Sequence, residues 1–390
     1  MTNKLTDKVT FRHGASVTNR IVMPPMLTFS GLEGGFASED TLKYYNARSQ
    51  AAGMMIVEFH YVSENGGPCT KAGVPEQLGI YDDDHLESIT NIAKALKKDG
   101  NKAILQIHHG GREAMGRAAK GKEVLAPSAI DFDFLDYPVR EMTNEEIEEI
   151  IKDFGRATKR AITAGFDGVE IHGANHYGLQ QFFSAISNQR EDKWGGSLEK
   201  RMAFPLAVVD EVKRVIAESA PENFAESAPE NFILGYRFSP EEIHGETVGY
   251  TYLEGLELIK EVIKREIDYI HLSLWNGYAT VPTGGEKSFG EYYKEILDAQ
   301  TKLILVGGVF DEKGAQNAIE NYTDLVAVGR GTLVDPEFGK KISEGRGNTI
   351  IHEISPEQLK KVSWTQGLKN VYTAPEGTSL PPLPNGESIK

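Results

Sequence analysis

Gly168-Val-Glu-Ile-His-Gly-Ala-Asn-His-Tyr177 is the stretch that decides the fold, and the polar loop that follows it extends to Arg201. The stretch begins with a short apolar segment of strand length and then places a His, an Asn and a Tyr within six positions. In a parallel α/β barrel, the side chains that do chemistry lie where a strand ends and a loop begins. We therefore interpret the stretch as a catalytic strand end, although the same three residue types also occur as loop scaffolding.

Seven further segments of strand length lie on either side of this stretch, and amphipathic segments of helix length separate them. Buried parallel strands are near-continuous apolar runs. Eight such units predict a closed α/β barrel, a (β/α)₈ TIM barrel, in a single domain over residues 1–344. A doubly wound open sheet also alternates, but no GxGxxG follows the first strand. The expected strands are 19–26, 54–62, 102–109, 168–172, 233–240, 269–275, 302–309 and 324–331, and the expected helices include 38–52, 83–98, 144–164, 198–217, 250–264 and 312–321.

Capping signals mark some helix ends. Asn144 is followed by Glu145 and Glu146, which predicts an N-cap with acidic residues in the first turn. Gly100 and Gly165 are expected to end the helices that precede them.

Three segments depart from the regular repeat. The long loop 109–136 is expected to cover the barrel mouth as a lid. Residues 217–224 are repeated at once as 225–232, and one copy should form a surface loop at the bottom of the barrel, so that deleting eight residues leaves activity unchanged. Residues 345–390 are expected to be a C-terminal extension, Pro-rich and partly disordered, that wraps the barrel or reaches a neighbouring subunit, with Trp364 buried.

The composition disfavours several classes of protein. A formal net charge of −15 argues against nucleic acid and anionic membranes as partners. The one cysteine, Cys69, excludes an internal disulfide and a Cys-ligated cluster. No apolar run approaches the ~20 residues that span a membrane, and the N-terminus is polar. We expect a cytoplasmic protein that acts on a small molecule. A metal site is not expected, because the adjacent His108 and His109 would point to opposite faces of a strand.

The last two strands end in glycines. Gly307 and Gly308 follow one of them, and Gly329 and Arg330 follow the other. Glycines at these two strand ends allow backbone N–H groups to approach a phosphate, and an arginine adds a charge-assisted contact. The pattern predicts a phosphate-bearing ligand at the barrel mouth.

Two polar residues lie in strands that should otherwise be filled with apolar side chains. Gln106 and Arg237 need partners if they are buried. A planar heterocycle could supply them, with Gln106 on an imide edge and Arg237 near negative charge on the ring. An internal network with Glu58 or Glu170 is the alternative. Flavin mononucleotide (FMN) fits both the phosphate and the polar ring edge.

Taken together, the motifs resemble the Old Yellow Enzyme family of NAD(P)H:flavin oxidoreductases over residues 11–338, in particular its short bacterial members. Each motif alone has limited specificity, but the set is specific. They are Asn19-Arg-Ile-Val-Met-Pro-Pro-Met26, Gln106-Ile-His-His-Gly-Gly-Arg112, His172-Gly-Ala-Asn-His-Tyr177, Gln181-Phe-Phe-Ser184, Asn188-Gln-Arg190, Gly195-Gly-Ser197 and Gly329-Arg330.

The resemblance implies an FMN enzyme that uses NADH or NADPH to reduce the flavin and passes hydride to the β-carbon of an activated alkene, such as an α,β-unsaturated carbonyl compound. It implies that His172 and Asn175 bind the carbonyl oxygen and that Tyr177 donates the proton. It also implies a homo-oligomer. The implied cofactor contacts are Pro25, Met26, Leu27, Phe59, Gln106, Arg237, Gly307, Gly308, Gly329 and Arg330, and Phe29 joins the three catalytic residues in the substrate site.

Three residues differ from the family pattern. Leu27 stands where a Thr or Cys usually contacts the flavin, Phe29 where a Tyr is frequent, and Phe59 where a small residue is usual. These differences leave open an FMN barrel of altered substrate class. A non-redox phosphate-binding barrel, of aldolase or isomerase type, is the other alternative, but Lys102 and Lys302 fall at strand starts rather than at strand ends.

Overall fold

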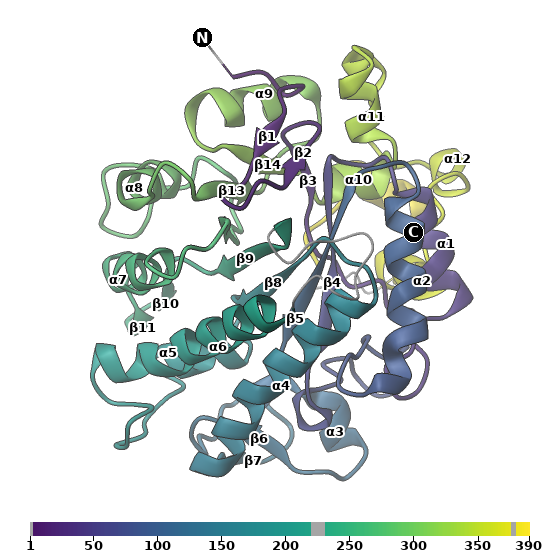
Figure 1. Cartoon of the computed structure of the whole chain (residues 1–390). Coiled ribbons are helices and arrows are strands. Elements are labelled where there is room, and N and C mark those ends of the chain that lie inside the picture. Colours follow the sequence, from purple (N-terminus) through teal and green to yellow (C-terminus); the bar gives the residue numbers. More distant parts are fainter. Residues whose placement is uncertain (1–2, 220–230, 376–379) are drawn as a thin grey trace.

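The computed structural model describes residues 3–219, 231–375 and 380–390. Eight parallel strands form a closed barrel in the spatial order β12-β13-β14-β3-β4-β5-β8-β9, and helices surround it (Figure 1). The predicted (β/α)₈ barrel is therefore confirmed. The barrel strands are β3 (Ile21–Met23), β4 (Met54–Tyr61), β5 (Lys102–His108), β8 (Gly168–Gly173), β9 (Ile233–Phe238), β12 (Tyr269–Leu272), β13 (Lys302–Val306) and β14 (Leu325–Ala327).

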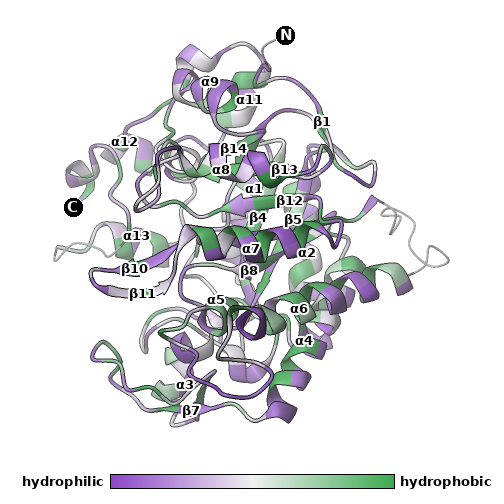
Figure 2. Ribbon diagram, turned by 90° about the vertical axis from the view of Figure 1, so that its left-hand side faces the viewer, coloured by the Kyte–Doolittle hydropathy of each residue, from purple (hydrophilic) through white to green (hydrophobic). Residues whose placement is uncertain are grey.

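The principal helices are amphipathic and bury one face against the strands. In α4 (Asn144–Thr163), Ile147, Ile150 and Phe154 are buried at helical spacing, and Figure 2 shows polar residues along its outer side. The N-cap of α4 is Thr143 and not Asn144 as expected, because the Thr143 side chain and Glu146 form a capping box. The others are α1 (Glu39–Ala47), α2 (Leu86–Lys97), α6 (Leu198–Glu218), α7 (Tyr252–Ile263), α8 (Phe289–Ile296), α9 (Glu312–Asn321), α10 (Arg330–Val334) and α11 (Phe338–Ser343).

An N-terminal hairpin closes the bottom of the barrel. Strands β1 (Val9–Thr10) and β2 (Ser16–Val17) pair antiparallel, and their apolar side chains pack onto a cluster of interior strand residues. Gly235 makes room in this cluster, because a Cβ at this position would lie 2.0 Å from the Tyr269 ring. The lower half of the barrel is thus a filled apolar core. The cluster comprises Val9, Phe11, Ala15, Val17, Val22, Met54, Ile56, Ile104, Ile233, Tyr269, Ile304, Leu325 and Ala327.

The loop predicted as a lid contains regular structure. It holds the short helix α3 (Met115–Ala119) and strand β6 (Val124–Ala126), which pairs parallel with β7 (Val139–Glu141). A second insertion, the hairpin of β10 (Glu242–His244) and β11 (Thr247–Tyr250), follows β9. Both insertions follow the carboxyl ends of barrel strands.

The C-terminal extension packs on the barrel. It contains α12 (Pro356–Leu359), α13 (Gln366–Tyr372) and a final helical turn at Gly386–Ile389. Trp364 is buried, as expected, and its indole N–H donates to the carbonyl of Leu333 at 2.9 Å. The boundary at residue 345 remains a prediction, and most of the tandem repeat at 217–232 lies outside the described residues.

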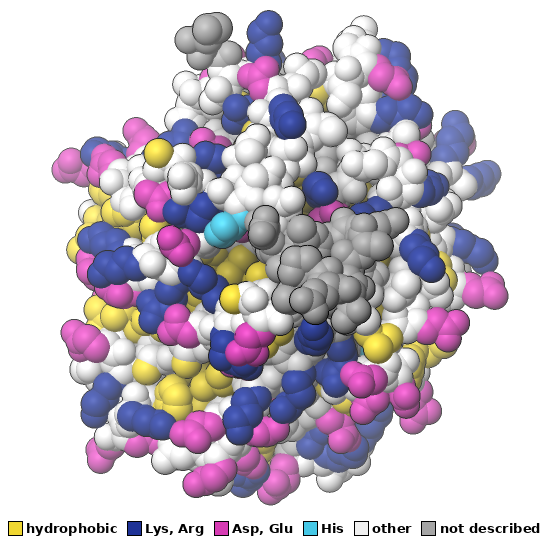
Figure 3. Space-filling model, viewed as in Figure 1, with side chains coloured by type: hydrophobic (Ala, Val, Ile, Leu, Met, Phe, Trp, Pro, Cys, Tyr) yellow, Lys and Arg dark blue, Asp and Glu magenta, His cyan; other side chains and the backbone are white. Residues whose placement is uncertain are grey.

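Charged side chains of both signs are interspersed over the face shown in Figure 3. In the part of the chain that the structure describes, no helix is long and apolar enough to cross a membrane.

Candidate active site

A cavity of about 340 Å³ opens at the carboxyl ends of the barrel strands. Its walls come from the segments that follow β3, β8, β12, β13 and β14, together with the C-terminal extension. The predicted site residues that line it are Pro25, Met26, Leu27, Phe29, Phe59, Asn175, Tyr177, Arg237, Gly307, Gly308, Gly329 and Arg330. The other two, Gln106 and His172, are fully buried in the strands beside it.

The strand interior changes from apolar to polar toward this cavity. Interior residues follow at intervals of two, because alternate side chains of a strand point to the same face. The pairing of β5 with β8 places Gln106 beside Glu170. One layer further up, His172, Arg237 and His271 are paired across three neighbouring strands. All five side chains are buried.

Glu170 holds part of this layer together. Its carboxylate accepts a hydrogen bond from Gln106 Nε2 at 2.6 Å and lies 2.9 Å from His271 Nδ1. Glu58 takes no part, because it accepts hydrogen bonds from Thr28 and Tyr45 instead. The internal network weighed from the sequence is therefore present in part: Gln106 binds Glu170, whereas Arg237 donates to Ser273 instead.

The network leaves polar atoms unsatisfied. Within the described residues, the buried Gln106 Oε1, Arg237 Nε, His172 Nε2 and His271 Nε2 have no hydrogen-bond partner. A buried polar atom without a partner costs about 1–3 kcal/mol, so an unsatisfied set at one end of the barrel indicates a ligand. The acceptor Gln106 Oε1 and the cationic Arg237 fit a ring that has an N–H edge and that gains negative charge on a nitrogen when it is reduced, as FMN does.

His172 is arranged as a hydrogen-bond donor. The N–H of Ala174 donates to His172 Nδ1 at 3.2 Å, so the proton of the neutral imidazole is on Nε2. Burial lowers the pKa of His172 well below its usual value, and the charges of Arg237 and His271 lower it further. His172 is therefore a neutral imidazole whose Nε2–H has no partner among the residues that the structure describes.

A short hydrogen-bond chain orients Asn175. Arg237 Nη2 donates to Ser273 Oγ at 3.2 Å, and Ser273 Oγ donates to Asn175 Oδ1 at 2.9 Å. Because the amide oxygen accepts from Ser273, the amide nitrogen remains available as a donor. The backbone N–H of Asn175 donates to Ser239 Oγ, and its φ of 57° is in the left-handed region, which Asn tolerates better than most residues.

Tyr177 belongs to a cluster of four rings. Phe59 lies 5.0 Å from the Tyr177 ring and 5.4 Å from the His172 ring, centroid to centroid. His108 completes the cluster, with its ring centroid 5.0 Å from that of Tyr177. Gln77 Nε2 lies 2.6 Å from His108 Nε2 and holds the His108 ring in place. Burial raises the pKa of the Tyr177 phenol well above its usual value. Tyr177 thus keeps its proton at neutral pH, and Phe59 packs between the cavity and His172.

The adjacent residues His108 and His109 have different surroundings. His108 belongs to the ring cluster, whereas His109 Nε2 lies 3.0 Å from Asn65 Oδ1. These two residues therefore do not face a common point.

The glycine-rich end of the cavity has the geometry of a backbone cradle. Gly307 and Gly308 have φ values of 131° and 73°, which side chains rarely adopt. Gly307 also lies against Gly277, since a Cβ on Gly307 would be 2.7 Å from Gly277 Cα. Arg330 donates to the carbonyl of Pro382 at 2.7 Å, and its guanidinium lies 4.9 Å from the Phe310 ring centroid. The extension thereby fixes the arginine at the cavity wall.

A second cavity of about 730 Å³ adjoins the first one. Asn175 and Tyr177 line both cavities. Phe132 and Phe134, from the loop predicted as a lid, line the second, and the Arg112 guanidinium lies 4.6 Å from the Phe132 ring centroid. This loop therefore forms a wall beside Asn175 and Tyr177.

Sequence reasoning missed several residues of this region. His271 and Ser273 could have been found, because they continue the interior period of β12 from Tyr269. Glu242 and His244 could also have been noticed, since they share one face of a strand. Leu368, Tyr372, Leu380 and Pro381 of the extension line the first cavity, and no local signal in the sequence points to this contact.

Known proteins resemble this chain closely. A model of the NADH:flavin oxidoreductase / NADH oxidase family matches residues 9–349. A probable NADH-dependent flavin oxidoreductase of Bacillus subtilis is 41% identical over 348 residues, which cover 89% of each chain. An NADH:acrylate oxidoreductase of Vibrio harveyi is 40% identical, over 87% of this chain and only 33% of its own length.

Solved structures agree with this result. Morphinone reductase in complex with tetrahydroNAD aligns with a TM-score of 0.75 and 27% identity, over 93% of this chain and 97% of its own. An old yellow enzyme homologue from Zymomonas mobilis aligns with the same TM-score at 23% identity, which supports the fold alone. Family membership makes FMN the cofactor and NADH or NADPH the reductant, and it rules out the non-redox barrel. The chain belongs to the NADH:flavin oxidoreductase / NADH oxidase family.

Proposed function

We propose that this protein reduces the carbon–carbon double bond of α,β-unsaturated carbonyl compounds at the expense of NADH or NADPH. The observation that carries the proposal is the arrangement of three different proton-bearing groups, on His172, Asn175 and Tyr177, beside one cavity. FMN, when bound, supplies the hydride. The protein must then polarise the carbonyl group of the substrate and donate a proton.

Two donors suit the carbonyl oxygen. Asn175 lines the cavity and has its amide nitrogen free, because its amide oxygen accepts from Ser273. His172 has an Nε2–H without a partner in the described chain, and Phe59 must shift if a substrate is to reach it, since Phe59 packs on the His172 ring. Donors directed at an oxygen that gains negative charge stabilise the transition state. Asn175 is therefore the primary donor and His172 the second.

Tyr177 suits the proton transfer. It lies on the wall shared by the two cavities, and its raised pKa keeps the phenol protonated until the α-carbon gains negative charge. A positioned general acid typically contributes a factor of ~10²–10⁴ to the rate. Tyr177 would thus protonate the α-carbon of the substrate, and Asn175, two residues earlier in the same loop, would bind its carbonyl oxygen.

The pocket residues provide the binding surface for the cofactor and the substrate. Gln106 and Arg237 would contact the ring edge of FMN, Pro25, Met26, Leu27 and Phe59 would line the ring, and the glycines with Arg330 would hold the phosphate. Phe29 would face the substrate. Relatives named for acrylate and fumarate make unsaturated carboxylic acids a second substrate class to test.

One anaerobic titration tests the proposal. Purified holoenzyme is reduced with NADH and, separately, with NADPH, and the flavin absorption is followed as 2-cyclohexenone is added. We expect the bands to bleach with a nucleotide and to return with the enone. Bands that return with acrylate or fumarate but not with the enone would assign the acid class instead. Bands that return with none of these compounds would refute alkene reduction.

A further inference from the structure

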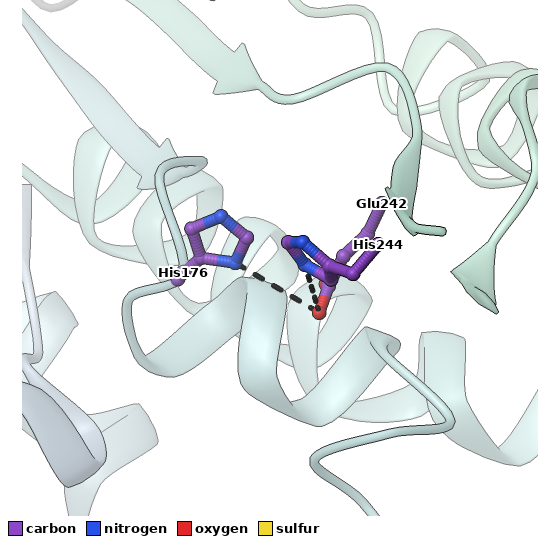
Figure 4. Close-up of side chains that lie close together, drawn as sticks. All are labelled: His176, Glu242 and His244. Atoms are coloured by element: carbon purple, nitrogen blue, oxygen red, sulfur yellow. Dashed lines mark ion pairs between the residues drawn. The ribbon is translucent and has the colours of Figure 1, made fainter. Parts of the chain in front are cut away.

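Three side chains converge on the wall of the second cavity (Figure 4). His176 Nδ1 and His244 Nε2 each lie 3.8 Å from the same oxygen of Glu242, Oε1. The three ligand-type atoms all lie within 4.8 Å of one another. These distances are too long for direct hydrogen bonds, and they are close to the ~3.3 Å that separates ligands bound at 2.0–2.1 Å around a tetrahedral ion.

The local structure holds these groups in place from two neighbouring strands. Glu242 and His244 are two residues apart on β10, so their side chains lie on the same face. His176 comes from the loop after β8 and has a φ of 64°. Since β8 and β9 pair in the barrel, the segments that follow them meet. The site is therefore built from the fold and not from one mobile loop.

Glu242 is oriented by a second layer of contacts. Its side chain is 2% exposed, and Gln180 Nε2 donates to Oε2 at 2.9 Å. The other oxygen, Oε1, is left to face the two imidazoles. Gln180 also accepts from the backbone N–H of His176 at 3.0 Å, and its Nε2 lies 3.4 Å from His176 Nδ1, a long contact that an ion would replace. Contacts of this kind orient the ligands of metal sites.

We propose that His176, Glu242 and His244 bind a divalent transition-metal ion, with Zn²⁺ the best match. Imidazole nitrogens and a carboxylate oxygen are the ligands of zinc sites that keep one coordination position open. The histidines are 44% and 56% exposed, so small rotations can close the site around an ion. All three residues line the second cavity, and the open position therefore faces water or an anionic oxygen there.

The location gives the ion a connection to the active site. Asn175 and Tyr177 line the same cavity, whose wall also carries Arg112 in an ion pair with Glu113 at 3.1 Å. An ion with an open position would make this cavity a site for carboxylate-bearing molecules. The metal site does not depend on the proposed alkene reduction, because its ligands take no part in that reaction.

Equilibrium dialysis of tag-free holoenzyme against Zn²⁺, with metal analysis by mass spectrometry, tests the inference. We expect one ion per chain. His244→Ala should weaken binding by about 100-fold, since it removes a ligand, and Gln180→Leu by roughly 10-fold, since it removes the group that orients Glu242. His352→Ala, which removes an exposed histidine far along the chain in the extension, should leave binding unchanged.

Two outcomes would overturn the metal site. One is wild-type protein that retains no more Zn²⁺ than His244→Ala, and the other is His352→Ala that loses as much as His244→Ala. The flavin absorption and the thermal unfolding of each variant show whether it is folded. Metal content and enone-dependent flavin reoxidation are separate readouts, so failure of one proposal is distinguishable from failure of the other.

Discussion

The lower and upper halves of the barrel interior are built from the same strands, but the lower half is lined by apolar side chains and the upper half by polar ones. On β5, Ile104 packs in the apolar cluster at the bottom, whereas Gln106, two residues later, is buried with an oxygen that has no partner within the described chain. On β9, Ile233 belongs to the lower half and Arg237 to the upper. The lower half is filled mainly by apolar side chains, although the Tyr269 hydroxyl there also has no partner among the described residues, and the upper half leaves several polar atoms for a ligand.

This difference separates two kinds of burial. In the lower half, side chains contribute to stability because they leave water and fill space. In the upper half, polar groups are buried at a cost to the folded state, and this cost is offset only when the cofactor and the substrate supply partners. Residues that stabilise the fold and residues that bind the ligand therefore lie only two positions apart on one strand, as Ile104 and Gln106 do on β5.

The largest expected effect belongs to Tyr177, at the cavity wall. In Tyr177→Phe, reduction of the flavin by NADH or NADPH should be unchanged, because the phenol takes no part in it. Reoxidation by a weakly activated alkene should slow by about 10²- to 10⁴-fold. Stopped-flow absorption of each half-reaction measures both rates.

The matched control for Tyr177 is Tyr322→Phe. Tyr322 is also a half-buried tyrosine, but it does not line either cavity. Neither rate should change in this variant. A Tyr177→Phe enzyme that reoxidises at the wild-type rate would show that the proton comes from another group.

A second pair of variants tests the two halves directly. Ile104→Ala should lower the free energy of unfolding of the apoprotein by about 2–5 kcal/mol through the cavity it creates, with little change in FMN affinity. Gln106→Leu should cost about 1–3 kcal/mol, because Glu170 loses a donor, and should raise the dissociation constant of FMN roughly 10-fold. Urea unfolding and flavin fluorescence measure the two quantities.

The division between the halves would be wrong if Ile104→Ala weakened FMN binding as much as Gln106→Leu does. If the Gln106→Leu protein bound FMN with unchanged affinity, Gln106 Oε1 would not be part of the cofactor site.

The sequence was sufficient to predict the lower half and most of the upper one. Apolar runs at regular spacing determine a closed barrel, and polar residues such as Gln106 and Arg237 are visible because they interrupt those runs. Contacts between distant segments were not predictable. The tail residues Tyr372 and Pro381 line the cavity, and Pro382 binds Arg330, because the chain returns over the barrel mouth. The metal cluster was missed because His176 and Glu242 come together only through the pairing of two strands.

Glu58 should produce a pH dependence of stability. It is a buried polar residue of β4 that is fully hydrogen-bonded, unlike Gln106. Burial raises the pKa of its carboxyl from 4.5 to about 7, although hydrogen bonds from Thr28 and Tyr45 oppose the shift. The folded state therefore holds a proton that the unfolded chain releases above pH 4.5. The contribution to stability is complete below pH 4.5 and is lost as the pH rises through 7, by at most about 3 kcal/mol.

Glu58→Gln is the test of this pH dependence. The amide keeps the shape of the acid and cannot ionise. We expect the free energy of unfolding of the wild-type apoprotein, measured in urea, to fall between pH 4.5 and 7 relative to that of the variant. Parallel curves for the two proteins over this range would show that Glu58 is ionised in the folded state.

The smallest effect is expected at Leu27. This residue lines the upper cavity, but its side chain is apolar, like those of the lower half. Where the family usually has a Thr or Cys, this leucine cannot donate a hydrogen bond to the flavin. Leu27→Thr should restore a donor, and a hydrogen bond worth about 1 kcal/mol to the reduced flavin raises a two-electron potential by roughly 20 mV. Leu27→Val controls for the change of shape, since valine matches threonine in size and has no donor. Redox titration against a dye should show a higher potential for the threonine variant than for the valine variant. Equal potentials would mean that this side chain affects the flavin through packing alone.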